Sequence, residues 1–186
     1  MEAKELEKCI DIFGDDIYRF CLKICLNKDD AEDLYQQTFL KALESNFILD
    51  WDNNPKALFF SISYKIYKSN TRKWARRNSI ASIINIDEKT ENILFSYENI
   101  ENDLLEKSLI NEITKIIDSL PDKIKIPLIL YYLFNFSTSN ISKAIKKPIG
   151  TVKSRLFKGR NTIKKRLEDI GYDFKYYFLH FIRYFS

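Results

Sequence analysis

The side chains best suited to chemistry lie near the C-terminus, in residues 148–166. Four apolar residues recur in and just after this segment at spacings of four, seven and four, which places them on one face of a helix. These are Val152, Leu156, Ile163 and Leu167. The other faces carry hydroxyl and cationic groups, namely Lys153, Ser154, Arg155, Lys158, Arg160, Lys164, Lys165 and Arg166. Thr151 is predicted to cap the first turn of this helix. The apolar stripe would pack against the protein, and the hydroxyl and cationic side chains on the other faces could bind phosphate groups. A solvated basic helix is the alternative at this point.

The chain offers little for catalysis or for metal binding. His180 is the only histidine, which argues against a histidine-based zinc site or a catalytic triad. The four glycines form no phosphate-binding loop. The three cysteines lack CxxC spacing, and Cys21 and Cys25 lie one helical turn apart, as buried thiols often do. We therefore expect no enzyme, no catalytic residue, no metal, no cofactor and no small-molecule substrate.

Charge is distributed unevenly along the 186 residues, although the net charge is only +4. Residues 123–167 hold twelve Lys or Arg and no acid, and residues 53–86 hold seven and no acid. Residues 79–106 carry seven acids and one Lys, and the first 52 residues carry thirteen acids against six cations. This alternation predicts an anionic polymer as partner. There is no secretion signal and no apolar run long enough to cross a membrane, so we expect a cytoplasmic protein.

Helices are predicted throughout, because Gly and Pro are scarce and apolar residues recur at spacings of three and four. Residues 4–26 give two apolar stripes with an interruption near Gly14. A helix over residues 29–45 follows an acidic first turn and would bury Ala31, Leu34, Phe39 and Leu43. Another runs over residues 56–77, with its apolar residues assigned mostly to the core: Phe59, Phe60 and Ile62.

The second half begins with an acidic stretch, residues 79–103, which lacks an apolar stripe and is predicted to be a linker. A helix over residues 104–118 follows. The next helix starts after Pro121, and Pro127 predicts a kink or a late helix start.

A helix-turn-helix is predicted over residues 137–166. Ser137 or Ser139 would cap a short helix that contains Ile141, residues 146–150 would form the turn, and the basic helix would come last. This geometry seats a helix in the major groove of DNA.

Two blocks of the chain resemble sigma factors of the extracytoplasmic-function (ECF) type, in the sigma-70 family. Residues 30–42, which read DAEDLYQQTFLKA, resemble the second conserved region of that family. Residues 120–130, Ile141 and residues 150–156, which read GTVKSRL, resemble the fourth. The blocks have the order and separation of the family and account for roughly residues 5–168.

The resemblance implies an all-α protein of two small helical domains joined by an acidic linker. Residues 1–78 would form the region 2 domain and residues 79–103 the linker. Residues 104–168 would form the region 4 helix-turn-helix domain, followed by an aromatic tail over residues 169–186. In the tail, residues 172–186 hold eight aromatic residues and lie outside the resemblance. We favour packing of the tail onto the second domain over a docking strip for another protein or an interfacial helix.

The resemblance also implies site residues. A polar face of residues 29–45 would dock on the β′ clamp helices of core RNA polymerase, through Asp33, Gln36, Gln37 and Lys41. Gln37 stands where the family more commonly has Glu. The −10 element would be bound by Asn53, Asn54, Lys65, Lys68, Arg72, Lys73, Arg76 and Arg77. Leu58 and the pair Tyr64-Lys65 depart from the Trp and the Arg-Asn pair of the family.

The −35 element would be bound by the basic helix, through Gly150, Thr151, Lys153, Ser154, Arg155, Phe157, Lys158 and Arg160. A cation reading guanine and an apolar ring touching the thymine methyl are sound pairings. Lys146 stands where the family often has Gly, and a left-handed backbone is costly for Lys, so we expect the turn to differ.

The predicted function is therefore that of a sigma factor, with core polymerase (β′ clamp helices and β flap), promoter DNA and an anti-sigma protein as partners. The main alternative is a free-standing helix-turn-helix regulator that binds an operator without polymerase. A weaker one is a regulatory partner that only mimics a sigma domain.

Overall fold

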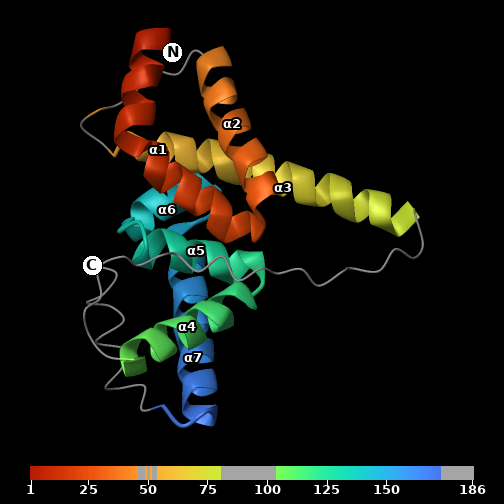
Figure 1. Ribbon diagram of the computed structural model, residues 1–186, viewed down its shortest axis with the longest axis vertical. Helices are drawn as coiled ribbons and strands as arrows, with labels where there is room; N and C mark the ends of the chain where they lie inside the picture. Colours follow the sequence, from red (N-terminus) through yellow and green to blue (C-terminus); the bar gives the residue numbers. More distant parts are fainter. Residues whose placement is uncertain (46–48, 50, 52–53, 81–103, 173–186) are drawn as a thin grey trace. The chain divides into compact units, whose positions relative to one another are not determined.

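The computed structural model in Figure 1 describes residues 1–45, 49, 51, 54–80 and 104–172, and for residues 74–80 and 104–108 it describes the backbone alone. Within these ranges the chain forms seven α-helices and no strand, which confirms the all-α prediction. The chain divides into two compact units, Met1–Ile93 (unit 1) and Leu94–Ser186 (unit 2). In this part of the chain no helix is long and apolar enough to cross a membrane.

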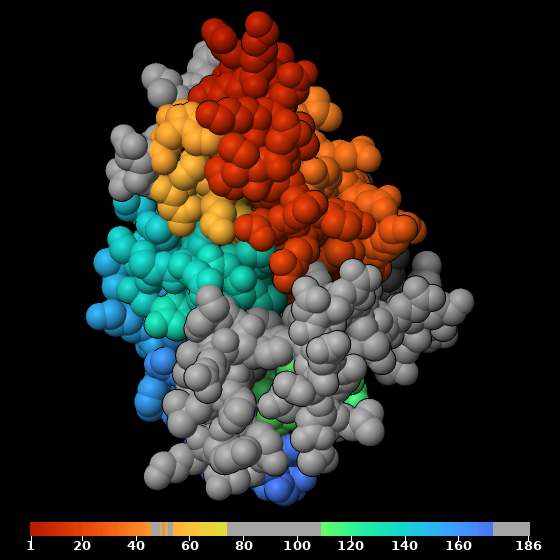
Figure 2. All heavy atoms as spheres, turned by 60° about the vertical axis from the view of Figure 1, so that its left-hand side comes forward, coloured from red at the N-terminus to blue at the C-terminus, as the bar shows by residue number. Residues whose placement is uncertain are grey.

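Unit 1 contains three helices that all pack on one another: α1 (Ala3–Cys25), α2 (Lys28–Glu44) and α3 (Lys56–Ile80). Side chains of α1 cover much of one face of this unit (Figure 2). The interruption expected near Gly14 is wrong, because α1 runs unbroken through it. A Cβ atom at Gly14 would lie 3.0 Å from the Tyr35 hydroxyl, so the small residue allows α1 and α2 to approach each other.

The helix α2 begins after Asn27, whose side chain accepts a hydrogen bond from the Asp30 backbone N–H (2.8 Å). Its buried residues are Ala31, Leu34, Thr38, Phe39 and Ala42. The predicted burial of Leu43 is wrong: this residue is 41% exposed. The reason is the helical angle, because Ala42 continues the stripe of Ala31 and Thr38, while Leu43 lies about 100° further round the helix.

The core of unit 1 is aromatic. Phe59 and Phe60 of α3 are fully buried, as predicted, with ring centroids 5.1 Å from Phe39 and 4.8 Å from Phe20 respectively. The hydroxyls of Thr38 and Ser63 lie 3.0 Å apart in a buried hydrogen bond between α2 and α3.

The cysteines of α1 behave as core residues. Cys9 and Cys21 are fully buried, and burial raises the pKa of Cys21 to about 12. Cys25 is half-buried at the end of the helix. All three are free thiols.

Unit 2 contains α4 (Leu104–Asp118), α5 (Asp122–Tyr132), α6 (Thr138–Ile145) and α7 (Ile149–Asp169). The predicted late start of α5 at Pro127 is wrong, because the helix begins at Asp122 and Pro127 lies buried inside it. All residues from Lys125 to Leu130 are buried, so α5 forms the centre of the unit. A Cβ atom at Gly159 of α7 would lie 2.5 Å from Leu128 Cδ1, which shows how closely α7 approaches α5.

The helix-turn-helix consists of α6 and α7. The Ser137 hydroxyl caps α6 by accepting a hydrogen bond from the Asn140 N–H (3.1 Å), as predicted. Lys146 ends α6 in the left-handed conformation (φ 51°, ψ 54°). The turn that was expected to differ therefore keeps left-handed geometry, with Lys147 N–H bonded to the Ser142 carbonyl (3.1 Å).

Helix α7 buries the predicted stripe of Val152, Leu156, Ile163 and Leu167. The expected cap at Thr151 is wrong, because α7 already begins at Ile149. Pro148 occupies the N-cap position and makes no side-chain capping bond. Its fixed φ angle suits the entry to a helix in place of such a bond.

Candidate nucleic-acid and protein interfaces

The polar face of α2 brings together the four residues predicted to bind a protein. Asp33, Gln36 and Lys41 are exposed and Gln37 is half-buried. The Gln37 amide donates a hydrogen bond to Asp33 Oδ2 (2.6 Å), which leaves the other carboxylate oxygen for a partner. Lys41 pairs with Glu44 (2.8 Å) in an exposed ion pair. The face can therefore present a fixed carboxylate to cationic groups.

Two apolar side chains on exposed sides of α2 were not predicted as site residues. Leu40 is 58% exposed, and Leu43 is exposed as described above. The spacing of Gln36, Leu40 and Leu43 at four and three residues places them along one helical stripe. The sequence did hold this signal, since Leu40 falls outside the buried stripe.

On α3, the structure places the predicted cations on the exposed side. Lys65, Arg72 and Lys73 are exposed, and Lys68 is half-buried with its ammonium 6.0 Å from the Tyr64 ring centroid. The spacing of Lys65, Lys68 and Arg72 at three and four residues gives a cationic stripe along the helix.

The structure describes only some of the remaining residues predicted to bind the −10 element. Asn54 is half-buried and has a left-handed backbone (φ 53°) just before α3. The side chains of Arg76 and Arg77, and the whole of Asn53, lie outside the described residues, as do the linker beyond Ile80 and the tail beyond Tyr172.

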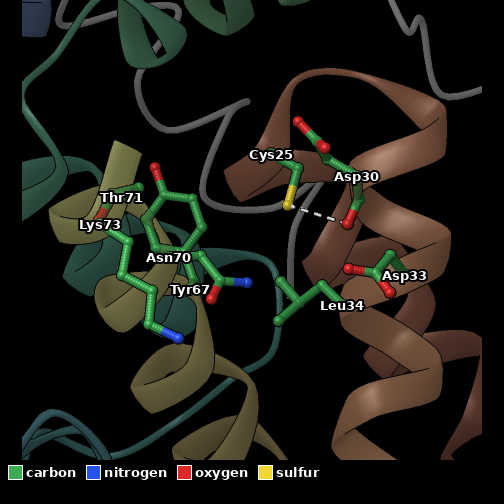
Figure 3. A pocket seen from close by; sticks show the side chains of 8 residues that line it. All are labelled: Cys25, Asp30, Asp33, Leu34, Tyr67, Asn70, Thr71 and Lys73. Atoms are coloured by element: carbon green, nitrogen blue, oxygen red, sulfur yellow. Dashed lines mark hydrogen bonds between the residues drawn. The ribbon is translucent and has the colours of Figure 1, made fainter. Parts of the chain in front are cut away.

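A pocket of about 590 Å³ lies within unit 1, between α3 and the region where α1 gives way to α2. Asp33 and Leu34 of α2 face Tyr67, Asn70 and Lys73 of α3 across it (Figure 3). Sequence reasoning assigned Asp33 to protein binding and Lys73 to DNA binding, and did not predict that they line one cavity. No pattern within either helix could have shown this, because it depends on how α2 and α3 pack.

On α7, five of the eight predicted contact residues are exposed and the other three are half-buried. Lys153, Ser154, Phe157 and Lys158 are exposed, and Phe157 at 60% is the most exposed large apolar residue of the described part of the chain. The other predicted residues are Gly150, which is exposed, and Thr151, Arg155 and Arg160, which are half-buried.

Two of these α7 residues are held by their own unit. The Ser154 hydroxyl donates to the Thr151 carbonyl (3.0 Å) and keeps its lone pairs as acceptors. Burial raises the pKa of the Tyr132 hydroxyl of α5, and a hydrogen bond from Arg160 acts in the opposite direction. Arg160 is therefore anchored on α5, unlike Lys153 and Lys158.

No group of His, Cys, Asp and Glu that could hold a metal ion occurs among the described residues. The surfaces found here are suited to binding: a carboxylate-bearing face and a cationic stripe in unit 1, and a cationic face with an exposed aromatic ring in unit 2.

Comparison with known proteins identifies both units. The model of Sigma-70 region 2 matches residues 9–77, and the model of Sigma-70 region 4 matches residues 110–163. The ECF RNA polymerase sigma factor SigW of Bacillus subtilis is 29% identical over 168 residues, covering 87% of this chain and 88% of that protein. The ECF RNA polymerase sigma-E factor of Haemophilus influenzae is 24% identical over 148 residues, covering 78% of each.

Among solved structures, the sigma factor RpoE in complex with the anti-sigma factor NepR from Bartonella quintana shares the fold. Its TM-score is 0.70 at 23% identity, over 89% of this chain and 98% of that chain. The chain belongs to the sigma-70 family of RNA polymerase sigma factors. Within that family it is a sigma factor of the ECF type, which directs promoter-specific initiation of transcription by core RNA polymerase.

Proposed function

We propose that the two units divide promoter recognition between them. Residues 1–78 dock on core polymerase and bind the −10 element, residues 104–168 bind the −35 element, and residues 79–103 connect them. The surface of α7 is the observation that carries this proposal, because its buried stripe leaves Lys153, Ser154, Phe157 and Lys158 together on the exposed side. Cations there can bind phosphate or guanine, and the Phe157 ring can contact a thymine methyl group.

In unit 1, the carboxylate and amide face of α2 binds the β′ clamp helices of polymerase. The charge of α3 supports a separate role for that helix, since its sequence has seven cations and no acid. Its exposed cations follow the phosphates of the −10 strand, and unpaired bases can stack on aromatic side chains. The protein then acts by binding and recruitment in the cytoplasm, with no reaction of its own to catalyse.

An anti-sigma protein is the proposed regulatory partner. Its support is the fold shared with RpoE, which was solved with the anti-sigma factor NepR. The aromatic tail over residues 169–186 remains a proposed packing segment of unit 2.

Run-off transcription with reconstituted core polymerase tests the docking face. A variant with Asp33→Arg and Gln36→Ala should lose at least about tenfold in core affinity, because a charge pair at the interface becomes repulsive. Asp11→Arg, at an exposed position of α1, makes the same charge change away from this face and should retain activity. If both variants keep full activity, while the protein binds DNA equally well without polymerase, the free-standing regulator is the better account.

A further inference from the structure

Trp51, in the connection between α2 and α3, is held by side chains of α1. The Trp51 indole N–H donates a hydrogen bond to Glu5 Oε1 (3.4 Å), and the Lys8 ammonium lies 4.3 Å from the centroid of the Trp51 ring. The Phe13 ring packs beside it, with centroids 6.1 Å apart. These contacts engage both the N–H and a face of the indole, so they fix Trp51 on α1 although it is 38% exposed.

A second contact joins α1 to the start of α3. Lys56, the first residue of α3, forms an ion pair with Asp16 of α1 (3.1 Å). Both side chains are about one-third exposed, so water and salt screen the pair only in part. A cation in the first turn opposes the helix dipole, and the Asp16 carboxylate offsets that charge. The pair therefore holds the N-terminal end of α3 where the helix packs against α1 (Figure 2).

The α1 residues that make these two contacts lie on one side of the helix. At about 100° per residue, Glu5, Lys8, Phe13 and Asp16 fall within an arc of about 140°. The sequence assigned no binding role to any of them. One side of α1 is therefore used to hold the chain just before α3 and the first residue of α3.

Asn54 lies between the two contacts, three residues after Trp51 and two before Lys56. Its backbone is left-handed (φ 53°), a conformation that Asn tolerates, and its carbonyl accepts a hydrogen bond from the Ala57 N–H (2.9 Å). Three residues span at most about 11 Å, so the contact of Trp51 with α1 restricts where Asn54 can lie. The Asn54 amide has donors and an acceptor suited to the edge of a base, and its position depends on α1.

We propose that α1 sets recognition of the −10 element by fixing Asn54, with Trp51 and Lys56 as positioning residues. This rests on the proposed function, in which Asn54 contacts that element. Specificity is a difference between the affinities for correct and incorrect bases. If Trp51 is released, Asn54 can take several positions and the two affinities become more equal. Phosphate contacts along α3 and docking on core polymerase do not depend on this restraint.

Substitutions at Trp51 test the proposal in holoenzyme reconstituted from the full-length protein and core polymerase. The probes are a promoter fragment that this holoenzyme transcribes and the same fragment with each −10 base replaced in turn. Trp51→Ala should lower the largest affinity ratio between original and replaced fragments by about fivefold, the discrimination typical of one base pair. Trp51→Phe keeps an aromatic ring for Lys8 and Phe13 and should retain most of that ratio. Fluorescence anisotropy measures each affinity.

The same preparations show whether Trp51 acts through specificity alone. Affinity of Trp51→Ala for core polymerase should stay within about twofold, as for most substitutions of exposed residues. Circular dichroism with thermal melting checks that the variant is folded.

A double variant tests whether Trp51 acts through Asn54. Asn54→Ala alone should already lose the discrimination. Adding Trp51→Ala should then change the ratio little further, because residues that act through one another do not have additive effects.

Two adjacent acids of α1 provide a matched pair for the second contact. Asp16→Lys places a cation against Lys56 and should lower the ratio by about twofold to fivefold, the range of partly exposed ion pairs. Asp15→Lys makes the same charge change at an exposed neighbouring position and should leave the ratio unchanged. Adding Lys56→Asp to Asp16→Lys restores opposite charges and should recover the ratio.

Three results would overturn the proposal. Equal weakening of core binding and of all promoter fragments in Trp51→Ala would show that Trp51 only stabilises unit 1. An additive loss in the double variant would show that the Trp51 ring contacts DNA itself. An unchanged ratio in Trp51→Ala, alongside a loss in Asn54→Ala, would show that α1 does not position Asn54. Failure of the proposed function is a separate result, in which Asn54→Ala also leaves the ratio unchanged.

Discussion

The two basic helices α3 and α7 carry cations in similar density but relate to their cores in different ways. Helix α7 meets α4, α5 and α6 along a single stripe of buried residues, and its predicted contact residues occupy the remaining surface. Helix α3 packs against both α1 and α2, so its aromatic residues are divided between a buried core and the wall of a pocket. A helix with one packed face reveals its binding surface in its sequence. A helix packed on two sides does so only in part, because periodicity cannot tell which neighbour each side meets.

The hydrophobic cores of unit 1 and unit 2 also differ in the side chains that form them. Unit 1 is held by fully buried aromatic rings and a buried hydroxyl pair, whereas unit 2 is built mainly around the aliphatic residues of α5, with Phe134 and Phe136 buried beside them. The expected consequence is that the two units respond separately to core substitutions.

The largest expected effect is that of Phe59→Ala in α3. The ring is fully buried, with centroids of Phe13 and Phe39 at 6.4 and 5.1 Å, so its loss should reduce the stability of unit 1 by about 3–5 kcal/mol. Both tryptophans of the chain belong to unit 1, so tryptophan fluorescence follows its unfolding alone.

Leu128→Ala in α5 is the matched substitution in unit 2. It should lower the transition seen by circular dichroism and leave the fluorescence transition in place. If both probes shift together in either variant, the chain unfolds as one cooperative unit and the comparison of two cores fails.

The next effect concerns DNA. Lys153→Ala with Lys158→Ala should lower affinity for a −35 duplex and reduce the slope of log affinity against log salt by about 2, since each phosphate contact contributes about 0.9. The measurement is a salt titration of binding by anisotropy. Lys115→Ala in α4, where the side chain pairs with Glu112 (2.7 Å), serves as the control and should leave the slope unchanged. An unchanged slope in the double variant would show that α7 is a solvated face after all.

A substitution at the contact between α5 and α7 should have a smaller effect, a loss of stability of unit 2. Gly159→Ala places a methyl group 2.5 Å from Leu128 Cδ1 and should destabilise unit 2 by about 1–3 kcal/mol, measured by chemical denaturation. Gly150→Ala is the matched control on the same helix, because nothing lies within 4 Å of its Cβ position. It should stabilise α7 by up to about 1 kcal/mol through helix propensity. Equal effects at both positions would contradict the close approach.

The smallest expected effect concerns the two helices, α1 and α6, that end in a residue with a left-handed backbone conformation. Lys146 in unit 2 is exposed, so Lys146→Gly should stabilise that unit by less than about 1 kcal/mol, as relief of backbone strain exceeds the added freedom of the unfolded chain. Leu26 ends α1 in the same conformation (φ 61°) but is half-buried, so Leu26→Gly also loses packing and should not stabilise unit 1. Thermal melts of the two variants give the comparison, and a loss of stability in Lys146→Gly would contradict it.

The sequence by itself determined the helical class, the order of the helices and the exposed surface of α7. These follow from local rules: the buried stripe of α7 repeats with helical spacing, and Ser137 can cap α6 through a bond to a residue three positions away. The polar set on α2 was also predictable, because Asp33, Gln36, Gln37 and Lys41 all avoid its buried stripe.

Only the tertiary structure decided which side of each helix meets a neighbour. It placed Ala42 rather than Leu43 in the interface of α2, kept α1 continuous through Gly14, where Tyr35 approaches the helix, and let α5 run through a buried Pro127. It also placed Asp33 of α2 and Lys73 of α3 on the same pocket. Such contacts join residues far apart in the chain, and helical periodicity fixes only the angle of a side chain about its own axis, not the partner that it faces.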